Sequence, residues 1–479
     1  MGFNSSKFFL FFPLVFLMFY AIPHKFRWIL LLISSIVFYM QSSQIYIFIP
    51  LLIILSAFIG GKYIEEEITQ KGKRKILISI LFFNLGILIF FKYINFITNG
   101  LFDLFNLLTK STNYNSLFLN LVVPLGLSYI TFQAIGYLIE IYRGTQKAEK
   151  HLGIFATYLM FFPKIASGPI ERAHNFIPQL YEKRSFDYQQ VADSFKLIAW
   201  GFLKKIVIAD RLAVLTNHVF ENPHQYSGIS LIIAVLLFTV QLYADFSGYT
   251  DIALGVAGTL GFKMMKNFDL PFIAKSTVEL WRRWHISLST WFNEYVFNPI
   301  VINKRDWGPW AVVFASIVTF LILGLWHGAS WNFVMFGFLQ GIILSLEFLT
   351  IKIRKKIRKK IPIIINNVLG VFFTFLFFSF ALIFFKTNSL KDAWCIILNM
   401  FNLNSKFYYN LEIEVWEFWF IFISAIFIFF IQFFQVKEAF IIKLAQKPVY
   451  LRWILYCILI LVILFFGIFN KSTYIYFQF

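Results

Sequence analysis

The chain has 479 residues, of which 59% are hydrophobic and 21% aromatic, while only 14% carry a charge. Soluble globular domains carry about a quarter charged residues, and the mean hydropathy of +0.72 excludes an ordinary soluble protein. The formal net charge of +19 is compatible with nucleic-acid binding at first sight. However, the basic residues gather between apolar runs, at 71–75, 143–150 and 352–360. This is the positive-inside pattern of membrane proteins, whose basic loops contact anionic lipid head groups, so we expect no nucleic acid.

Apolar runs long enough to cross a bilayer recur along the whole chain. We expect spanning segments near 8–22, 27–41, 45–60, 76–97, 116–141, 196–216, 229–245, 308–326, 331–350, 363–386, 416–435 and 450–469. Two interrupted stretches, 152–168 and 250–264, are expected to be re-entrant or partly spanning, because their Gly, Pro or polar residues are tolerated at depth only inside protein or along a cavity. The sequence therefore predicts an all-α polytopic membrane protein with about 11–13 transmembrane helices plus re-entrant and interfacial helices.

Orientation follows from the basic segments. Placing 71–75 in the cytoplasm makes 143–150 and 352–360 cytoplasmic as well, so the rule holds at all three places. Counting backwards predicts an N-terminus outside, and the run 8–22 is expected to be a retained helix because no small-residue cleavage site follows it. The polar interval 265–307 falls on the cytoplasmic side.

The stretch 279–295 contains the first histidine of interest, His285. Read as one helix, it places three tryptophans and Leu288 on one face by their spacing of three and four. Arg282 and Arg283 point away from that face. A short amphipathic helix of this kind is typical of a membrane interface. His285 is then either a functional group or a solvated side chain on an interfacial helix.

His327 lies between two long apolar runs, where an ionisable ring is costly and indicates a functional site by default. Histidine is also the side chain best suited to proton transfer near neutral pH. Gly324 and Gly328 bracket it at a spacing that allows close helix approach, and the next run repeats this spacing. We expect a tight turn between helices, with Trp326 beside the ring and Asn332 as a candidate to orient it. A histidine that only packs across a helix pair is the alternative.

The segment 241–251 ends an apolar run with two carboxylates, two tyrosines and two hydroxyl groups. No histidine or cysteine is near it in sequence, so it does not fit a metal site. It fits a polar cavity wall that binds a substrate or orients a histidine, through Tyr243, Asp245 and Ser247. Helix capping by Asp245, Ser247 and Asp251 is the alternative.

A further interrupted stretch is 161–172, where Pro163, Gly168 and Pro169 prevent a continuous helix. Lys164 within it either meets an anionic donor or is a cation at the surface of a simple cytoplasmic loop. The residues leave both interpretations open.

Taken together, these stretches resemble the membrane-bound O-acyltransferase (MBOAT) family. The resemblance rests on Trp-Arg-Arg-Trp-His-Ile-Ser-Leu-Ser-Thr-Trp at 281–291 and Leu-Trp-His-Gly-Ala-Ser-Trp at 325–331. Three further motifs match, at 124–129, 167–172 and 243–251. The branch it resembles most is that of the bacterial alginate and peptidoglycan O-acetylation proteins, with the D-alanyl-lipoteichoic-acid branch more distant.

The resemblance implies one multi-pass membrane domain over 1–479 around a central tunnel, with N-terminal helices in 1–110, a core with both histidine motifs in 115–350 and C-terminal helices in 351–479. It implies His327 as the catalytic residue and His285 as its companion. We expect Arg282 and Arg283 to attract the phosphates of coenzyme A. The remaining residues expected to bind substrate are Trp284, Tyr243, Asp245, Ser247, Trp326 and Asn332.

The resemblance further implies an O-acyltransferase of the bacterial cytoplasmic (inner) membrane. It would move an acetyl group from a cytoplasmic thioester, acetyl-coenzyme A or alternatively an acyl carrier protein, toward hydroxyls of an extracytoplasmic polysaccharide such as alginate or peptidoglycan. The chain has no Gly-x-Ser-x-Gly elbow of its own, so an extracytoplasmic acetyltransferase partner of the SGNH-hydrolase type is expected. Besides that partner we expect membrane lipid, and no metal.

A transporter of acyl groups or lipid-linked sugars, without transferase chemistry of its own, is the alternative function. Turnover of acetyl-coenzyme A separates the two. A channel or a structural scaffold explains neither histidine motif.

Overall fold

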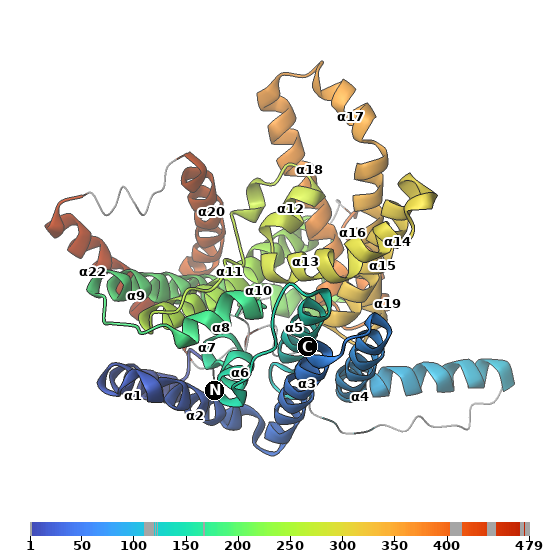
Figure 1. The fold of residues 1–479 in the computed structure, drawn as a ribbon. Helices are drawn as coiled ribbons and strands as arrows, with labels where there is room; N and C mark the ends of the chain where they lie inside the picture. The colour runs from blue at the N-terminus through green and yellow to red at the C-terminus, as the bar shows by residue number, and fades with distance from the viewer. Residues whose placement is uncertain are drawn as a thin grey trace. The chain divides into compact units, whose positions relative to one another are not determined.

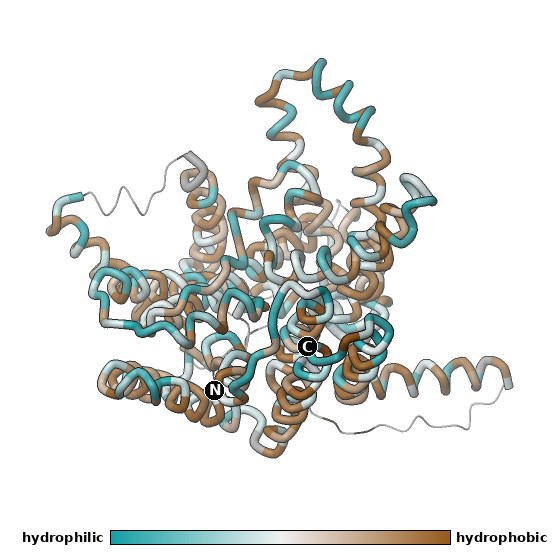
Figure 2. Tube along the Cα trace, viewed as in Figure 1, coloured by the Kyte–Doolittle hydropathy of each residue, from teal (hydrophilic) through white to brown (hydrophobic). Residues whose placement is uncertain are grey.

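The computed structural model describes residues 2–109, 119, 121, 123–165, 168–402, 414–437, 447–469 and 474. Within these residues, nine helices are long and apolar enough to cross a membrane, and Figure 2 shows their hydrophobic colouring. The prediction of an all-α polytopic membrane protein is therefore confirmed. Ser167, in one of the family motifs, and the first residues of the expected span 116–141 lie outside the described residues.

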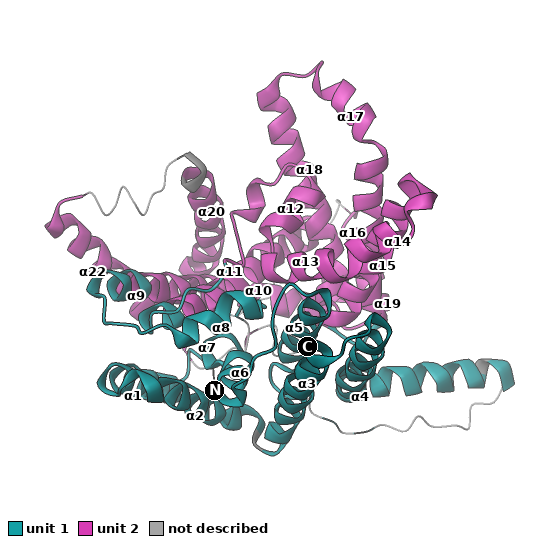
Figure 3. Ribbon diagram, in the orientation of Figure 1, with its two compact units in different colours: residues 1–194, 256–265, 328–330 teal, residues 195–255, 266–327, 331–479 magenta. Residues whose placement is uncertain are grey.

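The chain divides into two compact units (Figure 3). Unit 1 comprises residues 1–194, 256–265 and 328–330. Its helices (Figure 1) are α1 (Ser6–Ala21), α2 (His24–Ser43), η1 (Gln44–Ile47), α3 (Phe48–Glu66), α4 (Gln70–Thr109), α5 (Leu127–Arg143), α6 (Leu152–Met160), α7 (Phe162–Ile165), α8 (Ala173–Tyr181) and the first half of α9 (Tyr188–Phe202).

Unit 2 comprises residues 195–255, 266–327 and 331–479. Its first helices are η2 (Leu203–Ala209), α10 (Asp210–Glu221), η3 (Pro223–Gln225), α11 (Ile229–Thr259), η4 (Pro271–Ile273), α12 (Thr277–Arg283), α13 (Ile286–Phe292), η5 (Asn293–Phe297) and α14 (Asn298–Asn303). Its later helices are η6 (Arg305–Trp307), α15 (Pro309–His327), α16 (Trp331–Leu349), α17 (Ile351–Arg358), α18 (Ile363–Lys386), α19 (Leu390–Asn399), α20 (Val415–Lys437) and α22 (Val449–Phe466).

Several expected segments have different bounds in the structure. The segments 229–245 and 250–264 were expected to be separate, but α11 runs through the first and continues to Thr259 in the second, as one helix of 31 residues. Three of its polar residues, Asp245, Ser247 and Asp251, have buried lysine partners in the preceding helical segment. The expected span 196–216 is part of a longer helical stretch, α9 to α10, which includes the π-helix η2.

The stretch 152–168 is interrupted, as expected of its prolines and glycine. It consists of two short helices, α6 and α7. Lys164 in α7 is fully buried, so the expectation of a cation at the surface of a loop was wrong. Its ammonium group donates to Gln133 Oε1 and lies over the rings of Tyr158, at 4.1 Å, and Phe176, at 4.7 Å. These contacts offset part of the cost of burying a charge.

The pair α15 and α16 is packed backbone to backbone through glycines. A Cβ atom on Gly324 would lie 2.2 Å from the carbonyl oxygen of Phe333, and one on Gly337 would lie 2.1 Å from that of Phe320. A Cβ atom on Gly341 would lie 2.9 Å from the Cα of Ile317. The predicted close approach is confirmed, and residues 328–330 form the expected turn between the two helices.

Replacing Gly337 with valine should therefore destabilise the folded protein. The added carbon atoms would overlap backbone, which cannot move as a flexible side chain can, and overpacking of this kind costs about 1–3 kcal/mol. We expect a lower melting temperature in detergent. Gly86→Ala in α4 is the matched control, because a Cβ there meets nothing within 4 Å. Equal melting temperatures for the two variants would contradict the packing argument.

Candidate active site

The segment with the first histidine motif is not one helix. The prediction of a continuous amphipathic helix over 279–295 was wrong, since α12 ends at Arg283 and α13 begins at Ile286. His285 lies at the break with a left-handed backbone, φ 45° and ψ 53°. A non-glycine residue in this region is uncommon and strained, and such residues cluster at functional sites.

Asn267 holds this break in place. Its carbonyl oxygen accepts from the Ile286 N–H at 2.9 Å. Its side-chain Oδ1 accepts from both the N–H and the hydroxyl of Ser287, at 3.2 and 2.9 Å. The neighbouring residue Phe268 forms an isolated antiparallel bridge with Trp284. Residues 267–268, which lie 16 to 20 residues earlier in the chain than their partners, thus fix the backbone on both sides of His285.

The ring of His285 is fully buried among aromatic rings. Phe246 of α11 meets it edge to face at a centroid distance of 4.6 Å, and Trp326 of α15 lies 5.7 Å from it. Because burial disfavours the charged form, it lowers the pKa of His285 to about 3. The imidazole is therefore neutral near pH 7, and the interpretation of a solvated interfacial histidine was wrong.

His327 is the last residue of α15, and 4% of its surface is exposed. Its ring lies 4.9 Å from Phe385, 5.9 Å from Phe336 and 6.3 Å from Phe333. We call these three phenylalanines the aromatic cage. Trp326 lies 4.8 Å from the ring of His327. Since the same indole also contacts His285, the structure brings the two histidines together around Trp326.

Trp284 and Tyr243 belong to a further group of buried aromatic side chains. Their rings are 6.1 Å apart, and both contact Phe268, at 5.2 and 5.6 Å. Trp284 also meets Phe378 of α18 at 5.1 Å. Both predicted residues therefore belong to the buried aromatic wall that surrounds the first histidine, not to a membrane interface.

Asp245 and Ser247 face a pair of buried lysines instead of capping a helix. Lys205 contacts Asp245 at 2.5 Å and Asp210 at 2.9 Å. Lys204 donates to Ser247 at 3.0 Å and contacts Asp251 at 2.6 Å. The capping interpretation was wrong, because all three α11 residues lie inside the helix.

Two glycines allow this charged cluster to form. A Cβ on Gly201 would lie 2.6 Å from the carbonyl oxygen of Gly248, and the reverse distance is 2.8 Å. This close approach lets the lysines of η2 reach the acids of α11. Reasoning from the sequence missed both lysines, although two adjacent cations inside an apolar run carried a usable signal.

The two arginines before Trp284 differ in their contacts and in their exposure to solvent. Arg283 donates to Glu279 Oε1 at 3.0 Å and to the carbonyl oxygen of Asp269 at 3.0 Å, and lies 3.5 Å from the Asp269 carboxylate. Arg282 is exposed. Arg283 is thus engaged in holding the loop before α12, whereas the exposed Arg282 is accessible to a ligand.

Asn332 is buried at the start of α16. Its amide donates to the carbonyl oxygen of Thr387 at 2.6 Å and to the Thr387 hydroxyl at 3.2 Å. It thereby joins α16 to the end of α18, which contributes Phe385 to the aromatic cage. In the structure Asn332 fixes the helices around His327.

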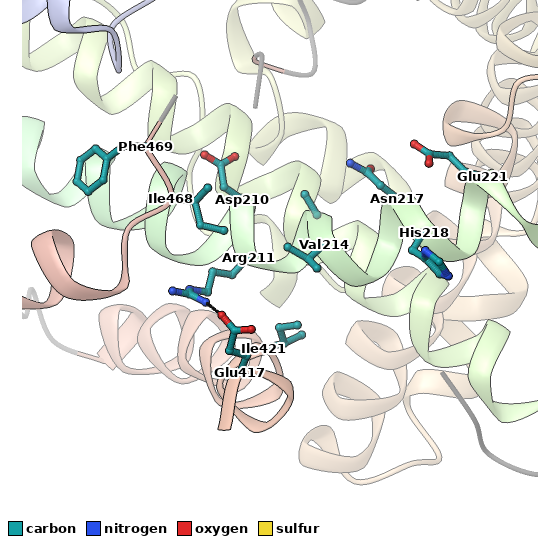
Figure 4. Close-up of a pocket in the computed structure, with 11 residues that line it drawn as sticks. Asp210, Arg211, Val214, Asn217, His218, Glu221, Glu417, Ile421, Ile468 and Phe469 are labelled. Carbon is teal, nitrogen blue, oxygen red and sulfur yellow. Dashed lines mark hydrogen bonds and ion pairs between the residues drawn. The ribbon is translucent and has the colours of Figure 1, made fainter. Parts of the chain in front are cut away.

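Unit 2 also contains a cavity of ≈ 660 Å³ (Figure 4). Arg211 of its wall donates to Glu417 at 2.6 Å and to the Phe466 carbonyl oxygen at 2.9 Å. Lys386, which follows Phe385 of the aromatic cage in the sequence, donates to Asn217 of the wall at 2.7 Å. The cavity is lined by Asp210, Arg211, Ala213, Val214, Asn217, His218, Glu221, Glu417, Ile421, Ile468 and Phe469, which include none of the predicted site residues.

The arrangement combines a neutral imidazole, a second imidazole at a helix end and a water-poor aromatic enclosure. Such an enclosure strengthens hydrogen bonds and favours proton transfer between a bound hydroxyl and an imidazole. Within the described part of the chain, no three His, Cys, Asp or Glu side chains gather as they would around a metal ion.

Comparisons with known proteins agree with this chemistry. A model of the MBOAT, membrane-bound O-acyltransferase family matches residues 150–387. The probable alginate O-acetylase AlgI of Pseudomonas aeruginosa is 32% identical over 85% of this chain and 76% of its own length. The peptidoglycan O-acetyltransferase of Helicobacter pylori is 31% identical over 87% of this chain and 82% of its own length.

A more distant relative is the teichoic acid D-alanyltransferase of Bacillus subtilis, 30% identical over 56% of this chain and 69% of its own length. The matched region of the family model contains both histidine motifs and the α11 segment. With relatives above 30% identity that extend over most of both sequences, the chain belongs to the membrane-bound O-acyltransferase family and is a membrane O-acyltransferase.

Proposed function

We propose that this protein takes an acetyl group from a cytoplasmic thioester donor and passes it across the membrane toward hydroxyl groups of an extracytoplasmic polysaccharide. The observation that carries the proposal is the buried pair of histidines around Trp326. The alginate and peptidoglycan O-acetylation named for the relatives supports an acetyl group and a glycan as the final acceptor.

His327 is the general base in this proposal. As an acceptor hydroxyl attacks the carbonyl carbon of the thioester, its proton moves to the imidazole and a C–O bond forms. The tetrahedral intermediate then collapses, the C–S bond breaks, and the imidazolium returns the proton to the leaving thiolate. The water-poor aromatic cage supports this role, because proton transfer is most effective where water does not compete.

His285 acts as a neutral hydrogen-bond donor. A buried imidazole that remains uncharged can polarise a carbonyl group through its N–H without itself giving up a full positive charge. Its fixed backbone supports this role, since Asn267 and Ser287 hold the residue in a defined orientation. The thioester carbonyl is the group that it would polarise.

The predicted orientation supports different access routes for donor and acceptor. If the basic segments are cytoplasmic, the end of α10, the start of α20 and the residues after α22 face outward. The cavity lined by Asn217 and Glu417 would then open on the acceptor side. Lys386 joins its wall to the end of α18, which carries Phe385 of the cage.

Acetyl-coenzyme A is the proposed donor, and a partner of the SGNH-hydrolase type is the proposed final transferase. Exposed Arg282 supports a donor with phosphate groups, because a guanidinium pairs with phosphate in a bidentate manner. In the absence of a nucleophile elbow in this chain, a serine of the partner would receive the acetyl group before the glycan does.

The function is tested by incubating the purified protein in proteoliposomes with radiolabelled acetyl-coenzyme A outside and a hydroxyl acceptor inside. Appearance of an acetyl ester in the lumen, together with free coenzyme A outside, supports the proposal. Lumenal acetyl-coenzyme A without any ester would instead identify a transporter.

We predict that His327→Ala lowers acyl transfer by about 10²- to 10⁴-fold, the usual contribution of a general base. The melting temperature of the variant in detergent shows whether it remains folded. Retained transfer in a well-folded variant would exclude the base assignment. Phe333→Leu, which changes the cage but keeps the base, is the matched control.

We predict that Arg282→Gln raises the KM for acetyl-coenzyme A several-fold with kcat unchanged, since it removes a contact made equally in the ground and transition states. Steady-state kinetics with acetyl-coenzyme A and with a short thioester lacking phosphates measures this. The short thioester should show the same KM with both proteins. Arg283→Gln should instead lower the melting temperature, because Arg283 ties the loop around Asp269 to α12.

We predict a pH dependence of stability from His285. Its pKa is about 3 in the folded protein and near 6.5 when unfolded, so below pH 6.5 the unfolded chain binds a proton that the folded chain does not. Stability therefore falls as the pH drops from 6.5 toward 3, by at most about 1.4 kcal/mol per pH unit. Melting temperatures between pH 7.5 and 5 should fall more steeply for the wild type than for His285→Gln. If the melting temperatures of the two proteins fell in parallel with pH, the imidazole of His285 would not be neutral in the folded state.

A further inference from the structure

The helix α17 combines a dense positive charge with exposed isoleucines. Seven lysines and arginines lie within residues 352–360. Ile351, Ile353 and Ile357 are 60%, 59% and 51% exposed. Figure 1 shows α17 where α16 and α18 extend beyond the other helices of unit 2, and in Figure 2 hydrophilic and hydrophobic colours alternate along it.

Several cations of α17 lie away from two of its isoleucines. At about 100° per residue, Ile353 and Ile357 fall on one side, while Lys352, Lys355 and Arg358 fall on the other, together with Ile351. A short helix with a cationic side and an apolar side, placed between two spanning helices, is suited to lie in the plane of a membrane surface.

A chain of contacts runs from α17 to the helix that precedes His285. Arg354 lies 3.7 Å from Glu347 at the end of α16. The same carboxylate accepts from the backbone N–H groups of Thr277, at 2.9 Å, and Val278, at 3.3 Å, in the first turn of α12. One turn further on, Trp281 donates to Gln340 of α16 at 3.0 Å. α12 ends two residues before His285.

We propose that α17 binds the anionic head groups of membrane lipids and, through Arg354 and Glu347, couples that lipid surface to the position of α12. Basic clusters beside a spanning helix attract anionic lipid. The exposed isoleucines identify a lipid surface as the occupant, because a soluble anion would leave them in water. The regulatory part rests on the proposed acyl transfer; the lipid binding does not.

The binding step is measured without activity. Ile353→Cys, in a chain with Cys395→Ser and Cys457→Ser, is labelled with an environment-sensitive dye and reconstituted in phosphatidylcholine or in phosphatidylcholine with phosphatidylglycerol. We expect a shift to shorter wavelength only with the anionic lipid, since each cation near such a surface contributes roughly five-fold to partitioning. Neutralising Lys355, Lys356 and Lys359 to glutamine should abolish it. The matched control neutralises Lys71, Lys73 and Lys75 and should keep it.

Several outcomes would overturn the binding proposal. The first is an equal shift of the dye emission in phosphatidylcholine alone. The second is a shift of the emission produced by inorganic phosphate in neutral membranes. The third is an equal loss of the shift when Lys71, Lys73 and Lys75 are neutralised. A shift caused by an acidic protein in neutral membranes would assign the surface to a protein partner instead.

The coupling is measured as acetyl-coenzyme A turnover in the same membranes. We expect the wild type and the Lys71 control to be several-fold more active with phosphatidylglycerol, and Glu347→Gln to keep the dye shift but lose this dependence. Lipid-dependent turnover in Glu347→Gln would overturn the coupling. Loss of turnover in every variant with an intact dye shift would count against the acyl-transfer function alone.

Discussion

The left-handed backbone at His285 is the constraint on which the buried site depends. It separates α12 from α13, and because the N–H groups of Ile286 and Ser287 bond to Asn267, the segment 266–270 must lie against this break. The same segment carries Phe268, which contacts Trp284 and Tyr243. Were the helix continuous, the imidazole would stay on a helix surface, and its contacts with Phe246 and Trp326 would not form.

A second constraint comes from the cost of burying charge in an apolar protein. Lys204 and Lys205 lie in the π-helix η2, where the extra residue in one turn brings consecutive side chains toward α11. Each lysine meets at least one aspartate, so neither ammonium group remains uncompensated. This cluster fixes α11, and α11 in turn presents Phe246 to His285. The lysines and aspartates of this cluster thus act on the site by fixing the position of α11, which carries Phe246.

The sequence predicted the features that depend on local pattern. Membrane-spanning helices were predicted from long apolar runs, and the close packing of α15 against α16 was predicted from the four-residue spacing of their glycines. The pairing of Asn267 with Ser287 was not predictable in this way, because neither residue carries a local signal and the contact depends on how a loop folds back. The lysine partners of Asp245 and Ser247 were not predicted either, because they lie about 40 residues earlier in the chain and no spacing rule joins them.

The two histidines lie at helix ends of opposite polarity, and this difference supports the separate roles proposed for them. His327 ends α15, a helix of 19 residues whose terminal carbonyl groups attract positive charge. His285 precedes the first N–H groups of α13, where a positive charge is disfavoured, and it is fully buried as well. Helix polarity and burial therefore act in the same direction on His285, and both favour its neutral form.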